Sequence, residues 1–229
     1  MVKTKYAIIV AGGVGSRSGD SLPKQFHEIA GHPMLWWTLK AFHDADSETE
    51  LIVVMHADFI DHWKRIAGND CPPHILTPGG ATRKDSVEAG LSLIDDAPDA
   101  LVAVHDAARP LASRKLISEG WTWAQKFGAV IPGVRVSDSL REGTGDDNRS
   151  VDRSRFFSVQ TPQVFSLDLL KDSYIKAKKA ENVIFTDDAS VVEWSGHRIH
   201  IYEGDPLNIK VTYPGDFRIA ADILLNNTY

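Results

Sequence analysis

Short apolar runs alternate with segments of helical period along this chain, and this alternation limits the possible folds more than any other feature. The runs are nearly continuous, as expected for strands buried on both faces of a parallel sheet; they fall at 6–11, 51–55, 74–76, 101–104 and 129–134. The segments between them place apolar residues three and four positions apart, which predicts helices with one apolar stripe; these cover 33–43, 58–67, 83–94 and 115–127. Strand and helix repeated in this order predict right-handed crossovers and a doubly wound, mostly parallel α/β sheet.

The segment 134–160 departs from this rhythm. It reads as two alternating stretches around the turn-rich centre EGTGDDN, which predicts a long, protruding β-hairpin arm. A lone hairpin is marginally stable in water, and this one carries few apolar residues for its length. We therefore expect the arm to pack against a second subunit and to act as a dimerisation arm.

The rest of the chain continues the pattern without a visible boundary. We expect helices at 167–180 and 186–195, the second capped by Thr186, then a strand at 198–203 and a final helix from about 215. Residues 1–229 contain no internal repeat and no low-complexity linker, which predicts a single domain.

Composition excludes several classes of protein. With 43% hydrophobic and 24% charged residues, the chain is neither disordered nor fibrous. Its net charge of -6 leaves no global basic surface for nucleic acid. The apolar run at 51–55 falls far short of the ~18 residues that a membrane helix needs. A lone cysteine, Cys71, fits a reducing compartment, so we expect a cytoplasmic protein without a membrane or nucleic-acid partner.

The loop after the first apolar run, AGGVGSRSGDSLPKQF at 11–26, is the first candidate site, because ligands of open α/β sheets bind at the carboxyl ends of the strands. Its glycines, Gly12, Gly13 and Gly15, would let backbone N–H groups close around a phosphate chain, although glycines alone fit a tight turn equally well. Arg17 and Lys24 add two cations, which repel unless an anion joins them. The loop matches neither the Walker A pattern nor the dinucleotide fingerprint.

Three further loops carry candidate residues. In HDAARP, Asp106 is suited to hold Mg²⁺ against phosphate oxygens, with a turn or helix cap as the alternative, and His105 is interpreted as a packing residue. GGATRKDSV opens a helix that could hold a ribose or a base edge, or could simply be capped. Lys210 follows the 198–203 strand and would by itself be an ordinary solvated lysine.

Taken together, these loops resemble a known family. The run A-G-G-x-G-x-R followed by P-K-Q is similar to the nucleotide-binding signature of the sugar-nucleotidyltransferase superfamily. The motifs GGATRKDSV, VHDAARP, VDRSRFFSVQTPQVF, TDDAS and NIKVT then occur in the order and approximate spacing of 2-C-methyl-D-erythritol 4-phosphate cytidylyltransferases, over essentially the whole chain. The resemblance implies a Rossmann-like nucleotidyltransferase fold, a homodimer, CTP and Mg²⁺ (or another divalent cation), and transfer of CMP to the polyol phosphate with release of pyrophosphate in non-mevalonate isoprenoid biosynthesis.

The resemblance also implies roles for individual residues. It assigns catalysis to Arg17, Lys24, Arg153 and Lys210, with the arm carrying Arg153 across the dimer. The nucleotide would be bound by Ala11, Gly12, Gly13, Gly15, Gly80, Arg83 and Ser86. The acceptor would be bound by Asp106, Arg109, Ser139, Thr161 and Thr186, with Asp106 also the metal ligand.

Some positions depart from the family pattern, and three other readings of the function stay open. Ala81 stands where many members have an acidic residue near the nucleoside, so the side-chain contact to the nucleoside at that position is not expected here. Leu207 stands where several members have an acidic residue, which leaves Asp205 as the candidate second metal ligand, and Ser139 stands where threonine is common. The same chemistry on ribitol 5-phosphate is the nearest alternative, although those enzymes typically read HDSVRP here. A non-catalytic nucleotide-binding module is the alternative of another class. A dehydrogenase ranks last, because Ser18 breaks the dinucleotide fingerprint.

Overall fold

The computed structural model describes residues 4–13, 22–95, 97, 99–180 and 183–226, and within them the main sheet has eight strands. The predicted apolar runs form five of these strands: β1 (Lys5–Ala11), β4 (Glu50–Met55), β5 (Ile75–Pro78), β6 (Leu101–Asp106) and β7 (Ala129–Arg135). The strand order is β10-β7-β11-β6-β1-β4-β5, and β12 (His200–Glu203) pairs with β7. Strands β6, β1, β4 and β5 run parallel, as does the pair β12 and β7, which confirms the mostly parallel sheet.

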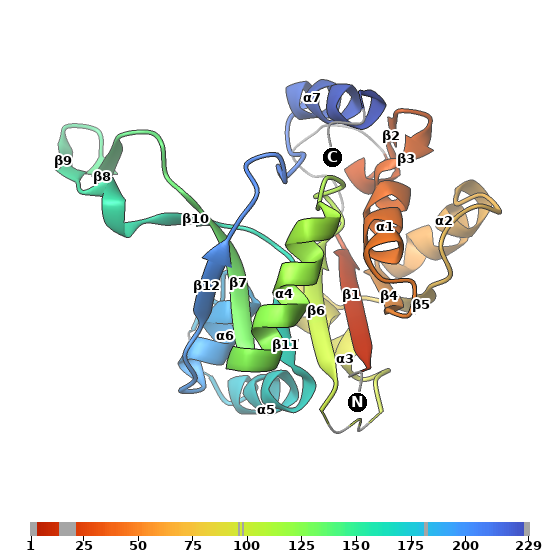
Figure 1. Cartoon of the computed structure of the whole chain (residues 1–229), viewed down its shortest axis with the longest axis horizontal. Coiled ribbons are helices and arrows are strands. Elements are labelled where there is room, and N and C mark those ends of the chain that lie inside the picture. The colour runs from red at the N-terminus through yellow and green to blue at the C-terminus, as the bar shows by residue number, and fades with distance from the viewer. Residues whose placement is uncertain (1–3, 14–21, 96, 98, 181–182, 227–229) are drawn as a thin grey trace.

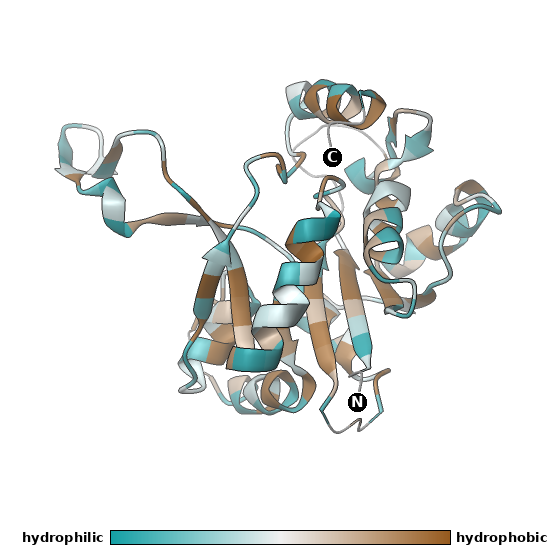
Figure 2. Ribbon diagram, viewed as in Figure 1, coloured by the Kyte–Doolittle hydropathy of each residue, from teal (hydrophilic) through white to brown (hydrophobic). Residues whose placement is uncertain are grey.

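Helices cover both faces of the sheet, as the doubly wound pattern predicts (Figure 1). Successive side chains of β1 point to opposite faces, so Ala7 and Ile9 pack into one apolar cluster and Ile8 into the other. The first cluster contains residues of α1 (Met34–Ala45) and α4 (Arg114–Phe127); the second contains residues of α3 (Arg83–Leu91), α5 (Leu167–Ala177) and α6 (Asp188–Trp194). Figure 2 shows the strands as mainly hydrophobic ribbons between these helices. Each fully buried aliphatic side chain contributes about 1.5–3 kcal/mol to this packing.

Two antiparallel strands depart from the predicted pattern. Strand β11 (Gln163–Ser166) lies between β6 and β7 and pairs antiparallel with both. Strand β10 (Phe157–Val159) pairs antiparallel with the far end of β7. Residues 160–162, with a cis Thr161–Pro162 bond, separate the two strands. Because β11 has only four residues and follows a proline, its sequence carries no clear strand signal.

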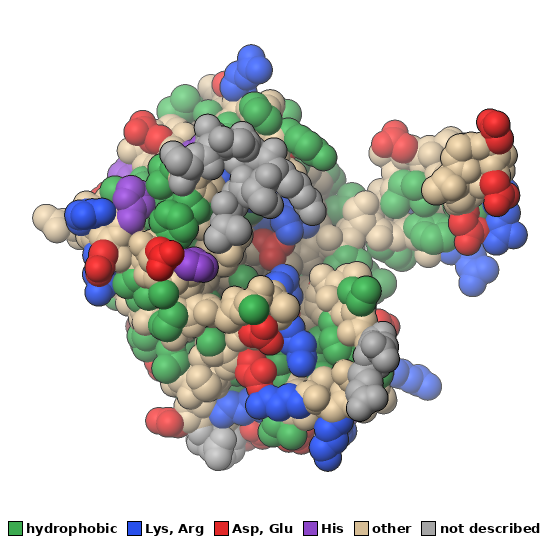
Figure 3. All heavy atoms as spheres, turned by 180° about the vertical axis from the view of Figure 1, so that it is seen from behind, with side chains coloured by type: hydrophobic (Ala, Val, Ile, Leu, Met, Phe, Trp, Pro, Cys, Tyr) green, Lys and Arg blue, Asp and Glu red, His purple; other side chains and the backbone are tan. Residues whose placement is uncertain are grey.

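The structure contains the predicted hairpin arm, but the arm is shorter than the predicted segment 134–160. Its hairpin consists of β8 (Leu140–Thr144) and β9 (Asp147–Val151), followed by the 3-10 turn η3 (Arg153–Arg155). The two ends of the predicted segment belong to strands β7 and β10 of the main sheet, where Arg135 pairs with Phe157. Figures 1 and 3 show the hairpin standing away from the body, and the space-filling view of Figure 3 shows acidic and basic side chains on it.

One predicted helix start was wrong. The helix near 186–195 begins at Asp188, and Asp187 rather than Thr186 caps it: the Asp187 carboxylate accepts a hydrogen bond from the Ser190 N–H at 2.9 Å. A carboxylate reaches the free N–H groups of a first turn from the N-cap position, and Thr186 lies one residue too early and is exposed.

The remaining elements are short, apart from one helix at the end of the described chain. They are η1 (Lys24–Phe26), β2 (Glu28–Ile29), β3 (His32–Pro33), η2 (Ala57–Phe59), α2 (Ile60–Ile66) and α7 (Pro214–Leu225). Among the described residues, no helix has both the length and the apolar character needed to cross a membrane.

Candidate active site

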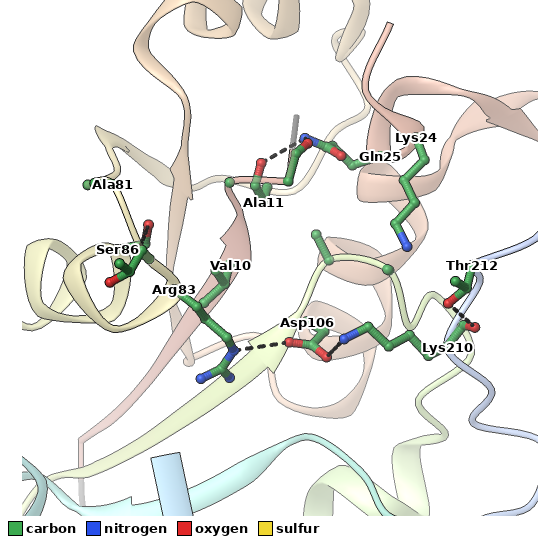
Figure 4. Close-up of a pocket in the computed structure, with 16 residues that line it drawn as sticks. Val10, Ala11, Lys24, Gln25, Ala81, Arg83, Ser86, Asp106, Lys210 and Thr212 are labelled. Carbon is green, nitrogen blue, oxygen red and sulfur yellow. Dashed lines mark hydrogen bonds and ion pairs between the residues drawn. The ribbon is translucent and has the colours of Figure 1, made fainter. Parts of the chain in front are cut away.

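A cleft of about 560 Å³ opens at the carboxyl edge of the sheet, where β1 and β6 end (Figure 4). This is the position that the parallel topology predicts for a ligand. The sequence-predicted site residues that line it are Ala11, Gly12, Gly13, Lys24, Gly80, Arg83, Ser86, Asp106 and Lys210. Residues Gly15 and Arg17 lie outside the part of the chain that the structure describes.

The start of the glycine loop is fixed by a buried glutamine. The side-chain amide of Gln25 donates to the Ala11 carbonyl at 2.7 Å and to the Gly13 carbonyl at 3.1 Å. Lys24, next to it, points its ammonium into the cleft and donates to the Val211 carbonyl at 2.7 Å. The turn η1 is therefore joined both to the start of the loop after β1, through Gln25, and to the segment before α7, through Lys24.

The start of α3 forms the opposite wall of the cleft. Thr82 and Asp85 make a capping box, in which the Thr82 hydroxyl accepts from the Asp85 N–H at 3.1 Å and the Asp85 carboxylate accepts from the Thr82 N–H at 3.0 Å. A Cβ on Gly79 would lie 2.7 Å from the Ser86 hydroxyl, so this backbone passes too close to α3 for a side chain. The wall thus presents backbone and hydroxyl groups. Thr82 was not among the predicted site residues, although its capping-box spacing marks the helix start.

Asp106 stands at the centre of the cleft among three cations. Its carboxylate accepts a hydrogen bond from Lys210 Nζ at 2.8 Å, and Arg83 Nε and Arg109 Nε lie 3.5 Å and 4.0 Å away. Burial alone would raise the pKa of Asp106, but Arg83, Lys210 and Arg109 outweigh it and lower the pKa to about 2. Asp106 is therefore ionised at neutral pH. Figure 4 shows Arg83 and Lys210 approaching it from opposite sides.

Arg83 is held from behind by a second carboxylate. Asp188, fully buried at the start of α6, accepts a hydrogen bond from Arg83 Nη2 at 2.7 Å and another from the Tyr174 hydroxyl, also at 2.7 Å. Burial would lower the pKa of Arg83, and Asp188 reverses this and raises it. No local pattern in the sequence indicates this pair, since 105 positions separate the two residues.

Arg109 and Thr161 lie behind the cleft rather than along its lining. Arg109 Nη1 donates to the Asn208 carbonyl at 2.8 Å, and burial lowers the pKa of Arg109. The Asp106 N–H donates to the Thr161 hydroxyl at 3.1 Å. His105 is fully buried, as its interpretation as a packing residue requires, and burial lowers its pKa to about 4. Its ring meets the ring of Phe42 edge-on.

Three predicted site residues are not brought to this cleft within the described chain. Ser139 and Arg153 are exposed on the arm, where Arg153 donates to the Ser137 carbonyl, and Thr186 is exposed in the segment before α6. Asp205, the candidate second metal ligand, also does not line the cleft, and its carboxylate accepts from the Leu207 N–H at 2.9 Å.

The donor set around Asp106 fits Mg²⁺ held mainly by a substrate's phosphates. No group of three or more His, Cys, Asp or Glu side chains that could hold a metal occurs in the described residues. Mg²⁺ in proteins commonly binds one or two carboxylates and completes its shell with phosphate oxygens and water, so the single ionised carboxylate of Asp106 fits this mode of binding.

Comparison with known proteins identifies the family. The sequence model of the family described as IspD, 2-C-methyl-D-erythritol 4-phosphate cytidylyltransferase, matches residues 5–226. The enzymes of that name from Bacteroides thetaiotaomicron and Azobacteroides pseudotrichonymphae are each 42% identical to this chain, over 95% and 97% of it and 98% and 100% of their own lengths. The chain belongs to the IspD family.

Solved structures of IspD enzymes are similar to this chain in fold as well as in sequence. The crystal structure of 2-C-methyl-D-erythritol 4-phosphate cytidylyltransferase from Thermus thermophilus is 31% identical with a TM-score of 0.79, covering 95% of this chain and 98% of that one. The 4-diphosphocytidyl-2C-methyl-D-erythritol synthase from Anaerococcus prevotii is 28% identical with a TM-score of 0.82, covering 97% and 96%.

Proposed function

We propose that this IspD family member transfers CMP from CTP to 2-C-methyl-D-erythritol 4-phosphate and releases pyrophosphate. The observation that carries the proposal is that Lys24, Arg83, Asp106 and Lys210 line one cleft beside the backbone of Gly12 and Gly13. This combination suits a polyphosphate chain, because backbone N–H groups and cations converge where negative charge must be held.

The proposed reaction is a direct displacement. A phosphate oxygen of the acceptor attacks the α-phosphorus of CTP, and the bond from that phosphorus to the bridging oxygen of pyrophosphate breaks. Arg17, Lys24 and Lys210 would stabilise the charge that builds on the α-phosphate, which requires positioning and electrostatics but no covalent intermediate.

Asp106 is the residue that would hold Mg²⁺, which supplies neutralisation of the phosphate charge when bound. Arg83, locked by Asp188, would keep the Asp106 carboxylate ionised and directed into the cleft. The exposed backbone around Gly80 and the hydroxyl of Ser86 would receive the cytidine at the start of α3.

We further propose that the single domain 1–229 works as a cytoplasmic homodimer, with the arm of one subunit completing the site of the other. The positions of Ser139 and Arg153, exposed on the arm and away from the cleft of their own subunit, support this arrangement. Arg153 would then position the acceptor phosphate together with Arg109, Thr161 and Thr186.

The decisive experiment measures pyrophosphate release with Mg²⁺, each of the four nucleoside triphosphates, and either 2-C-methyl-D-erythritol 4-phosphate or ribitol 5-phosphate. Release with CTP and the methylerythritol phosphate alone is expected. Release with ribitol 5-phosphate would assign the other acceptor. CTP binding without release from any pair would refute transferase activity and leave a nucleotide-binding module.

A further inference from the structure

Three segments of the chain meet behind the cleft in a ring of four hydrogen bonds, and two of these segments carry the charged lining residues Asp106 and Lys210. His105 Nε2 lies 3.0 Å from the Arg109 carbonyl, and Arg109 Nη1 donates to the Asn208 carbonyl at 2.8 Å. Asn208 Nδ2 donates to the Thr161 carbonyl at 2.9 Å, and the Thr161 hydroxyl lies 3.1 Å from His105 Nδ1, which closes the ring. His105 and Asn208 are fully buried and Thr161 is 5% exposed.

The direction of these hydrogen bonds follows from donor chemistry. A carbonyl oxygen can only accept, so His105 must carry its proton on Nε2 to bond to Arg109. In the neutral ring Nδ1 is then an acceptor, and the Thr161 hydroxyl must donate to it. The same hydroxyl accepts from the Asp106 N–H. The hydroxyl proton of Thr161 is therefore donated to His105 Nδ1, and the contact of Thr161 with Asp106 is to the backbone N–H of Asp106 and not to its carboxylate.

The ring joins the segments that hold the charged groups together. Asp106 directly follows His105, Lys210 lies two residues after Asn208, and the ion pair of Lys210 with Asp106 crosses between the two loops. Gln160 adds a further tie, since its amide donates to the Asp205 carbonyl at 2.8 Å and accepts from the Asp205 N–H at 3.1 Å. None of His105, Thr161 and Asn208 lines the cleft.

We propose that His105 and Asn208 are positioning residues, which set the spacing of Asp106, Arg109 and Lys210 through this ring, and that Thr161 acts as part of it. The proposal rests on the proposed transfer reaction, in which Asp106 and Lys210 line the cleft that holds the reacting phosphates and Arg109 lies directly behind Asp106. A misplacement of about 1 Å far from the reacting atoms can cost ~10²-fold in rate. Breaking the ring should therefore lower turnover more than it lowers nucleotide binding.

The first test compares two variants of His105 with a matched control. His105→Phe keeps an aromatic ring but removes both hydrogen bonds, whereas His105→Gln keeps an N–H donor for the Arg109 carbonyl. Tyr202→Phe is the control, because it also removes one buried hydrogen bond to a backbone carbonyl, that of Leu116, outside the ring. We expect His105→Phe to lower kcat at least ~10-fold with the KM for CTP within about 3-fold, and His105→Gln to recover most of the loss.

Tyr202→Phe should leave both kinetic parameters within about 3-fold of wild type. If His105→Phe keeps wild-type kcat, or if His105→Gln and Tyr202→Phe lose as much kcat as His105→Phe does, the positioning role is refuted. Should His105→Phe fail to fold, Asn208→Ala breaks the ring from its other side and should show the same split between kcat and KM.

A second readout does not depend on activity. Long-range ¹H–¹⁵N spectra of ¹⁵N-histidine-labelled protein distinguish the two neutral tautomers, and the His105 signals are assigned by their absence in His105→Gln. The Nε2–H tautomer at pH 7 is expected. The Nδ1–H tautomer or a charged imidazole would refute the proposed hydrogen-bond ring even if the enzyme is active. Wild-type protein that releases no pyrophosphate yet shows the Nε2–H tautomer would refute the transferase and support the ring.

Discussion

Replacing Asp106 with asparagine removes a negative charge that lies among three cations. The Asp106 side chain is only 14% exposed, with Lys210 Nζ at 2.8 Å and Arg83 Nε at 3.5 Å. These cations lower its pKa from 3.8 to about 2 against the effect of burial, which corresponds to about 2.5 kcal/mol at roughly 1.4 kcal/mol for each unit of pKa. We therefore expect Asp106→Asn to lower the free energy of unfolding by about 2.5 kcal/mol at pH 7.

The pH dependence of this difference follows from the direction of the shift. Because the folded-state pKa lies below the unfolded value, the ionised carboxylate contributes fully above about pH 4, and its contribution is lost as the pH falls through 2. Urea unfolding of wild type and Asp106→Asn at pH 7, 5 and 3 tests this. The difference in unfolding free energy should be the same at pH 7 and 5 and fall to about half at pH 3.

Asp61→Asn is the matched control, because the Asp61 side chain is 90% exposed and its ion pair with Lys64 is long, at 3.8 Å. Its effect should stay below about 0.5 kcal/mol at every pH. Equal stability of Asp106→Asn and wild type at pH 7 would refute the reasoning, since the cations would then stabilise the carboxylate no more than water does. A difference that stays constant from pH 5 to pH 3 would refute it equally.

Three other predictions concern catalysis, assembly and packing. Lys24→Ala and Arg17→Ala should each lower turnover at least ~10²-fold with unchanged circular dichroism, and near wild-type turnover would remove their assigned roles. A re-formed mixture of Lys24→Ala and Arg153→Ala subunits should recover about a quarter of wild-type activity if the arm acts across the dimer, whereas a monomer in sedimentation or no recovery would contradict this. Gly90→Ala should cost about 1–2 kcal/mol in urea unfolding, because its Cβ would lie 2.8 Å from Ile8 Cγ2, and unchanged stability would show that α3 can shift.

Much of the fold could be predicted because its signals are local. A buried parallel strand is a short apolar run, so β1, β4, β6 and β7 were predicted to within two residues at each end. Strand β11 carries the same kind of residues, and Val164 and Phe165 are fully buried. It was missed because a four-residue run has no measurable period and only its two neighbours in space make it a strand.

The candidate site divides in the same way. Residue order alone establishes which loops follow the parallel strands and which residue types they carry, so Lys24, Asp106 and Lys210 could be predicted to share one edge of the sheet. The pairing of these groups depends on the folded chain: Arg83 pairs with the buried carboxylate of Asp188, and Lys210 with Asp106 from 104 residues away. Local sequence determines the secondary structure of each segment and which side chains it carries. A hydrogen bond between two distant segments forms only when their separation is right to within a few tenths of an ångström, and the packing of the whole sheet sets that separation.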